Sequence, residues 1–324
     1  MRQDFQLRSP IIDQGQRPQF QDDRESPVTD RQAILAQVKL VPSMPSVVME
    51  LRSFMNDPNV SFDKLSRAIE YDPGLTVNIL QLANSAYFGW TRTIKTVKEA
   101  VTRLGTSRVF QMVLCMSVAP LVRKPIKGYD TDSEGLWEHS IATAICAEQL
   151  VQILGLKDLD EAFTAGLLHD MGKVVLGTFV EIDDKQLKES VAVDGLSFNE
   201  AEQMILGVDH AEVAAELLSS WNLPESVVAS ARWHHQPHLA EDKHQKLVDL
   251  IHVADHLCMT YGFGAGTDSS HYRLDDAARV RIGLELGTTE VVAMRVINGM
   301  DDLGDMFNGA KKTIEVKETT STFK

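Results

Sequence analysis

From about residue 30 onward, apolar residues return every three or four positions, which is the spacing of one face of an α-helix. Few stretches show the two-residue alternation of a half-buried strand. Prolines such as Pro42 and Pro45 separate the periodic stretches. Short helices that follow one another closely predict an all-α fold. The pattern predicts helices around residues 47–55, 61–69, 72–83, 108–122, 137–154, 159–168, 247–261 and 284–300.

Several helix starts carry side chains that can cap the first turn. Asp72 is followed by proline, which places an N-cap carboxylate directly before a proline at the first helical position. Ser197 opens a sequence with the spacing of a capping box. Asp209 and Glu212 have the same spacing, and this second box places His210 in the first turn of its helix.

Composition limits the class of partner. The chain has 324 residues, of which 44% are hydrophobic and 24% charged, as in an ordinary soluble protein with one large domain or two subdomains. Its net charge of −14 argues against a DNA or RNA backbone as the main partner, because phosphate backbones require basic surface. We therefore expect no nucleic-acid partner, although a small nucleotide could still bind in a local pocket.

Cysteine usage and terminal sequence favour a cytoplasmic protein. The three cysteines lie far apart in apolar surroundings and form no CxxC pair, so we expect buried, reduced thiols at Cys115, Cys146 and Cys258. The start of the chain lacks the apolar segment of a signal peptide, and no apolar run approaches the roughly 18 residues of a membrane helix. Residues 1–30 are rich in Gln, Asp, Arg and Pro, which predicts a disordered tail.

Candidate chemistry is concentrated in the segment Gly166–Lys173, which follows an apolar run. A histidine next to an aspartate at a helix end, as in His169 and Asp170, can hold a divalent metal ion. Gly172 suits the turn that closes the helix, and Lys173 would then meet an anionic oxygen of a ligand. Taken alone, the pair fits an N-cap aspartate beside a surface histidine better than it fits a metal site.

Other histidines and one aspartate strengthen the metal hypothesis. Asp255 lies inside a predicted helix among apolar residues, and a buried carboxylate without a partner is costly, so it needs a metal or a basic residue. Considered singly, His210 fits a surface position, and the pair beside Trp233 fits a packed helix end with one exposed ring. Converging helices would let all of them share one centre. The candidates are His139, His210, His234, His235 and Asp255.

Four segments resemble the HDOD domain, the HD-related output domain of bacterial signalling proteins. They are Val41–Pro45 with the apolar stripe that follows, Asp72–Thr76, Leu82–Phe88 and Ala100–Gly105. The resemblance runs from about residue 32 to 260 and implies an entirely helical fold, in which an N-terminal bundle packs on a degenerate HD-type bundle. We expect a tail at 1–30, the N-terminal bundle at 31–122, the metal-site bundle at 123–262, and one or more helices and a tail at 263–324.

The order of the candidate ligands also resembles that of metal-bearing HD-superfamily domains. By that resemblance, a first ion would be held by His139, His169, Asp170 and Asp255. A second ion would be held by His210, His234 and His235, with Asp170 as a bridge. Imidazole and carboxylate ligands suit divalent Fe, Mn, Zn or Ni, and the sequence does not choose among these metals or between one ion and two.

One activity of the superfamily is not expected. The related HD-GYP phosphodiesterases follow their His–His pair with a glutamate and an Asp-Gly-x-Gly-Tyr-Pro segment. Here His234 and His235 are followed by Gln236 and Pro237, and that segment is missing. Hydrolysis of a cyclic dinucleotide by that route is therefore doubtful.

Three functions remain open. The favoured one is a non-catalytic signalling module that holds metal, contacts a protein partner or a small nucleotide, and transmits its state through the N-terminal bundle. The second is a metal-dependent phosphohydrolase acting on a nucleotide or phosphodiester, with Asp170 and Lys173 as catalytic residues and Arg232 assisting at the phosphate. The third is a helical scaffold with vestigial histidines. No receiver, kinase or DNA-binding segment is evident, so we expect a separate signalling protein to supply the input.

Overall fold

The computed structural model describes residues 31–55, 61–84, 92–124, 126, 129, 134–179, 184–264 and 273–301. The predicted tail at 1–30 and the predicted C-terminal tail beyond residue 301 lie outside these ranges, as does most of the link between the bundles. Within the described ranges every regular element is a helix, which confirms the predicted all-α class.

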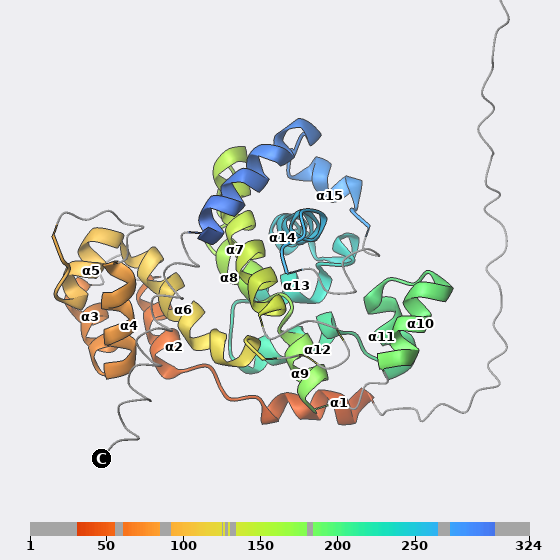
Figure 1. The fold of residues 1–324 in the computed structure, drawn as a ribbon, viewed down its shortest axis with the longest axis horizontal. Helices are drawn as coiled ribbons and strands as arrows, with labels where there is room; N and C mark the ends of the chain where they lie inside the picture. The colour runs from red at the N-terminus through yellow and green to blue at the C-terminus, as the bar shows by residue number, and fades with distance from the viewer. Residues whose placement is uncertain are drawn as a thin grey trace, which may run out of the picture.

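The N-terminal bundle forms one end of the molecule (Figure 1). Its helices begin where the sequence predicts: the side chain of Asp72 accepts a hydrogen bond from the Leu75 amide at 3.0 Å, and the following proline starts α4. Apolar residues at helical spacing, such as Leu51, Ile69 and Ile79, are fully buried. The bundle consists of α2 (Ser46–Met55), α3 (Phe62–Glu70), α4 (Pro73–Ala83), α5 (Val97–Leu104) and α6 (Thr106–Val122).

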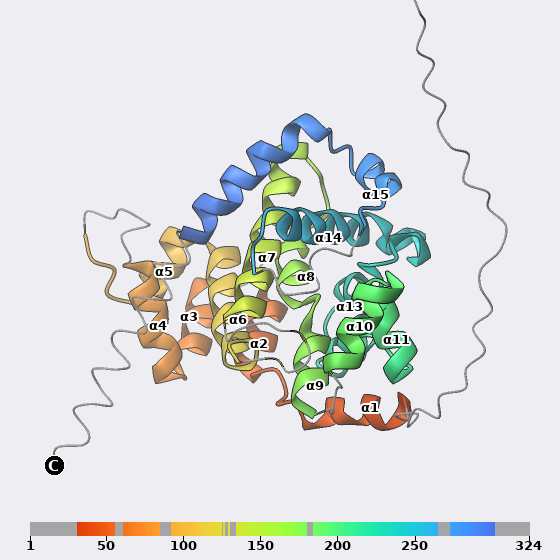
Figure 2. The same cartoon turned by 45° about the vertical axis from the view of Figure 1, so that its right-hand side comes forward.

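The second bundle carries the candidate ligands. Its central helices α7 and α8 pack against each other and against α14, and α12 packs between α9 and α13 (Figures 1 and 2). Helices α10 (Asp184–Asp194) and α11 pair at one side. The other members are α7 (Gly135–Leu154), α8 (Ala162–Leu168), α9 (Met171–Phe179), α11 (Phe198–Leu206), α12 (His210–Ser220), α13 (Glu225–Trp233), η3 (Pro237–Leu239) and α14 (Asp242–Thr260).

The two bundles share one hydrophobic core, because α6 contacts α7, α8 and α9. The first helix, α1 (Arg31–Gln37), lies along the second bundle against α9, and the turn that follows, η1 (Val38–Leu40), contacts α12 (Figure 1). The sequence predicts that these residues belong to the N-terminal bundle at 31–122. The boundaries between the two bundles stay a prediction. The first described helix and the turn after it therefore pack against the bundle that carries the candidate ligands.

The C-terminal part closes over α14 and α7. Helix α15 (Asp276–Arg281) is joined to α14 by Arg281, whose two guanidinium nitrogens each lie 2.7 Å from a carboxylate oxygen of the buried Asp249. After η4 (Leu286–Thr288), a helix at 289–301 passes over α7, where Gly299 lies close to the side chain of Ile145 (Figure 2). This confirms the helix predicted near the C-terminal end.

Two glycines let helices approach closely around the candidate site. The prediction that Gly172 lies in a closing turn is wrong, because it lies in the first turn of α9. A Cβ atom at Gly172 would lie 1.9 Å from the carbonyl oxygen of His210, so only glycine allows α9 and α12 to pack this tightly. A Cβ atom at Gly166 would similarly lie 2.8 Å from the Cα atom of Ala144 and would push α8 away from α7.

Two further expectations can be compared with the described residues. The three cysteines are buried and free, as predicted. Within the described ranges, none of the individual helices has the length and apolar character to cross a membrane; α5 and α6 pass such a test only as a pair, which is bent by 118°.

Candidate metal centre

The seven predicted ligands come together inside the second bundle. Each lies at or near a helix end, except for the mid-helix Asp255: His139 is in the first turn of α7, His169 and Asp170 join α8 to α9, His210 starts α12, and His234 and His235 follow α13. The surface alternative fails for His169 and His210, which are each 0% exposed. His234 is also 0% exposed, as the alternative of a packed helix end allows. His235 is partly exposed, as expected for one ring of the pair.

Asp170 lies between two groups of imidazoles. Its Oδ2 atom is 3.5 Å from Nε2 of His169 and 3.7 Å from Nε2 of His139. Its other oxygen, Oδ1, is 3.4 Å from Nε2 of His210 and 3.7 Å from Nε2 of His234. Each carboxylate oxygen therefore faces one group, which is the arrangement of a carboxylate that bridges two ions.

The remaining ligand atoms complete the two groups. Asp255 Oδ1 lies 2.9 Å from Nε2 of His139 and 3.6 Å from Nε2 of His169. His235 Nε2 lies 2.9 Å from Nε2 of His210. Ligand atoms that share one tetrahedral Zn-type ion, at about 2.0–2.3 Å from it, are themselves about 3.3–3.8 Å apart. The observed separations are therefore close to those that metal coordination requires.

Hydrogen bonds at the outer ring nitrogens aim four imidazoles at the centre. In His210, Nδ1 lies 2.6 Å from Oε2 of Glu202. In three others the acceptors are backbone carbonyls, those of Gly166 for His169 (2.8 Å), Ala231 for His234 (2.8 Å) and Phe263 for His139 (3.3 Å). When Nδ1–H donates outward, the lone pair of Nε2 faces inward, which is the usual tautomer of a metal-bound histidine.

Several of these inward atoms lack a hydrogen-bond partner among the described residues. They are Nε2 of His169, Nε2 of His234 and both carboxylate oxygens of Asp170. The ammonium of Lys173 lies 2.8 Å from Asp170 Oδ2 as an ion pair, without the geometry of a hydrogen bond to it. Buried polar atoms left unpaired are costly, and a cation at the centre would satisfy all four. The residues present therefore fit a divalent metal ion.

The pKa shifts differ within the centre: against the effect of burial, neighbouring carboxylates raise the pKa values of His139, His169 and His210, whereas His234 and Asp170 shift toward the forms that bind metal. Burial, followed by the charge of His169, lowers the pKa of His234 to about 3, so this imidazole is neutral. Burial by itself would raise the pKa of Asp170, but Lys173 and the surrounding histidines hold that pKa well below its ordinary value. Neutral imidazole and ionised carboxylate are the forms that bind metal.

A second layer of side chains supports His210. The buried carboxylate of Glu202, in α11, accepts from the backbone amide of His210 at 2.8 Å as well as from its ring. The hydroxyl of Tyr129, a fully buried residue of the link between the bundles, donates to the other oxygen of Glu202. The ammonium of Lys173 lies 5.8 Å from the Tyr129 ring centroid. Glu202 and Tyr129 were not predicted from the sequence. The place of Glu202 among apolar residues of α11 was nevertheless a usable signal for a buried carboxylate that needs a partner.

His252 also has a structural role that the sequence analysis missed. Its Nδ1 lies 2.6 Å from the carbonyl oxygen of His234, and its Nε2 accepts from the amide of Asp275 at 2.8 Å. It thus holds the turn with the two adjacent histidines against α14 and against the segment that leads to α15.

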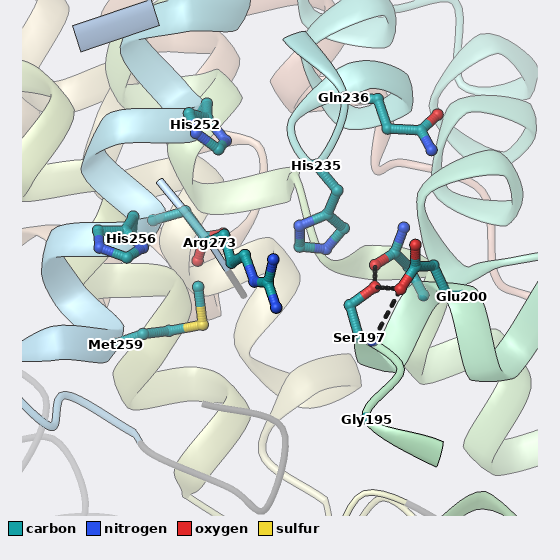
Figure 3. Close-up of a pocket in the computed structure, with 11 residues that line it drawn as sticks. Gly195, Ser197, Glu200, His235, Gln236, His252, His256, Met259 and Arg273 are labelled. Carbon is teal, nitrogen blue, oxygen red and sulfur yellow. Dashed lines mark hydrogen bonds between the residues drawn. The ribbon is translucent and has the colours of Figure 1, made fainter. Parts of the chain in front are cut away.

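The two cations proposed for a phosphate are both paired with carboxylates in the structure. Lys173 is buried and its ammonium faces Asp170. Arg232 lies 3.7 Å from a carboxylate oxygen of Asp209 and 3.6 Å from one of Glu212, and it stacks over the ring of Trp233 at 4.3 Å. Neither cation lines the cavity that opens beside the centre, whose walls include His235 and Asp255 (Figure 3).

The family follows from a match over most of the chain. The family model of the HDOD domain matches residues 41–237. The chain belongs to the HDOD domain family. This membership agrees with the resemblance drawn from the N-terminal motifs and with the helical architecture.

Two solved proteins share the fold, and a further protein is related in sequence. A solved HDOD domain protein of unknown function from Geobacter sulfurreducens is 23% identical, with a TM-score of 0.64 over 89% of this chain and 97% of that one. A solved protein from Shewanella amazonensis SB2B, which its name assigns provisionally to the phosphohydrolases, is 26% identical, with a TM-score of 0.65 over 85% of this chain and 98% of that one. An uncharacterised protein of Treponema pallidum (strain Nichols) is 26% identical over 216 residues, which cover 66% of this chain but only 41% of that protein.

Proposed function

We propose that this HDOD protein is a regulatory module that holds one or two divalent metal ions in the centre around Asp170 and signals through protein contacts rather than through turnover. His139, His169, Asp170 and Asp255 would hold one ion, and His210, His234 and His235, with Asp170 between the groups, a second. A bound ion would supply a positive charge, a Lewis acid, and a site for an anionic ligand. A separate signalling protein is the proposed partner, and a small nucleotide the proposed ligand.

The observation that carries the regulatory proposal is the connection from the centre to the link between the bundles. His210 is held by Glu202, and Glu202 is held by the Tyr129 hydroxyl from the link. Asp170 is paired with Lys173, whose ammonium lies beside the same tyrosine ring. A change in the charge at the centre would therefore alter the forces on Tyr129 by two routes.

The chain's own residues also explain why the centre would respond to metal. Asp170 and Lys173 form a buried ion pair, and burying charges is costly unless every partner is in place. When an ion binds the Asp170 carboxylate, the attraction between Lys173 and Asp170 weakens. The contact between the Lys173 ammonium and the Tyr129 ring then contributes more to the position of Lys173. Tyr129 would then relax toward a different position.

Hydrogen exchange can test this connection. We expect metal addition to change the exchange rates of backbone amides in α6 and in the link of the wild-type protein, and Tyr129→Phe to reduce that change while metal stays bound. Tyr71→Phe is the matched control, because Tyr71 is 89% exposed on the N-terminal bundle. Equal responses in the wild type and Tyr129→Phe would exclude the route through Tyr129.

A second function remains a candidate because a cavity borders the centre at His235 and Asp255. In that case the protein would be a metal-dependent phosphohydrolase, and Asp170 would be required for turnover. The discriminating assay offers nucleotides and phosphodiesters to the protein loaded with Mn²⁺ or Fe²⁺. Turnover that disappears in Asp170→Asn would establish the enzyme, whereas bound metal without turnover would favour the regulatory module.

A further inference from the structure

The cavity beside the centre has a volume of about 380 Å³, which lies in the range of small-molecule sites. One wall is α14, with His256 and Met259, and the opposite wall is the start of α11, with Ser197 and Glu200 (Figure 3). His235 lies at the edge that faces the metal centre. A ligand in this cavity would therefore lie within reach of whatever the centre holds.

Arg273 is the cation of this cavity. Figure 3 shows its guanidinium projecting from the α14 side toward Ser197, below His235. Among the residues that the structure describes, no carboxylate lies within ion-pair distance of Arg273, and no hydrogen bond holds its guanidinium. The planar guanidinium presents paired N–H donors that match the oxygens of a phosphate or a carboxylate.

The acidic side chains of the same cavity are already engaged. The Glu200 carboxylate accepts from the backbone amide of Ser197 at 2.9 Å and from its hydroxyl at 2.8 Å. The other acidic lining residue is Asp255, which is directed at His139. Glu200 and Asp255 are therefore occupied, whereas the guanidinium of Arg273 still has N–H groups that can donate to a ligand.

We propose that this cavity binds a small phosphate monoester, with Arg273 holding the phosphoryl group beside the metal centre. The proposal deepens the proposed function, on which its metal-side contact rests, and it moves the phosphate contact from Lys173 and Arg232 to Arg273. Phosphate fits better than carboxylate, because two of its three terminal oxygens can accept from the paired donors of the guanidinium while the third faces the centre. The cavity suits one molecule of mononucleotide size, and free phosphate has the same recognition chemistry.

Calorimetric titration of the full-length protein, loaded with Mn²⁺, tests the assignment. The probes are adenosine monophosphate, inorganic phosphate and adenosine, which lacks the phosphoryl group. We expect adenosine monophosphate to bind, adenosine to bind at least tenfold more weakly, and Arg273→Gln to weaken the monophosphate at least tenfold. Arg273→Lys should retain part of the affinity, because it keeps the charge and loses the paired donors. Comparable affinity for inorganic phosphate would identify the free ion as the ligand recognised.

The control variant is Arg295→Gln, which removes the same charge from the exposed helix at 289–301, where Arg295 contacts Gln149. Each variant is first checked for an unchanged far-ultraviolet circular dichroism spectrum and for its metal content. Equal affinity in Arg273→Gln and the wild type, or no binding of either phosphate by the wild type, would overturn the assignment. A wild-type protein that takes up no metal but still binds phosphate through Arg273 would support the cavity assignment and contradict the proposed metal-holding function.

Discussion

Gly172→Ala is the sharpest structural perturbation of the candidate centre. The added Cβ would lie 1.9 Å from the carbonyl oxygen of His210 and 2.8 Å from the amide nitrogen of Ala214, whereas real Cβ contacts are essentially never below 3.0 Å. The His210 carbonyl would have to retreat from α9 by at least about 1.1 Å, and it cannot turn aside because it is part of the α12 backbone.

The displacement has consequences for stability and for the site. Overpacking of this kind costs about 3 kcal/mol, which corresponds to a fall of about 4–5 °C in the melting temperature, Tm, for a chain of this length. The same shift carries His210 away from Asp170, because these residues flank the contact on α12 and at the start of α9. We therefore expect both a lower Tm and a lower metal content than in the wild type.

Thermal denaturation followed by circular dichroism, together with elemental analysis, provides the measurement. Gly287→Ala is the matched control: a Cβ there meets nothing within 4 Å, so its Tm should stay within about 2 °C of the wild type. A Gly172→Ala protein with the Tm and metal content of the wild type would show that α9 and α12 are not packed as described.

Three other substitutions or reactions test the packing away from the centre. Asp72→Ala removes the acceptor for the Leu75 amide at the start of α4 and should cost about 1 kcal/mol in urea unfolding; an unchanged midpoint would refute the cap. Arg281→Met removes the bidentate partner of the buried Asp249 carboxylate and should lower the free energy of unfolding by about 1–3 kcal/mol. Most of that loss should be recovered when Asp249→Asn is added; additive losses would argue against the pair. Burial raises the pKa of the Cys115 thiol to about 12, so at pH 8 it is protonated and inaccessible, and we expect no reaction with an aromatic disulfide reagent until urea is added; rapid reaction of the native protein would contradict its burial.

Local sequence signals predicted much of the fold, because they act over a few residues. The cap at Asp72, the capping box at Ser197 and the cap at Asp209 each start a helix where expected. Gly172 shows the limit of such signals. Glycine suits both a closing turn and a close helix contact, and only the position of α12, some forty residues further along the chain, decides between them.

The candidate site could be predicted only as far as its ligands. Their order along the chain resembles that of a known superfamily, and the buried position of Asp255 within an apolar stretch demanded a partner. Glu202 offered a similar signal on the apolar face of α11, whereas Tyr129 and Arg273 carried none. Tyr129 meets Glu202 across 73 positions of sequence, and Arg273 enters the cavity from a segment beyond α14, so their roles depend on how the helices are arranged.

The most direct measurement for the whole account is metal bound per chain. Purified protein is equilibrated with Mn²⁺, Fe²⁺ or Zn²⁺, desalted and analysed for its elements, in parallel with Asp170→Asn and His234→Gln. We expect at least one ion per chain in the wild type, and less than half of that in both variants, with helical content unchanged. A wild-type chain that binds none of these ions, or variants that retain them fully, would contradict the metal centre.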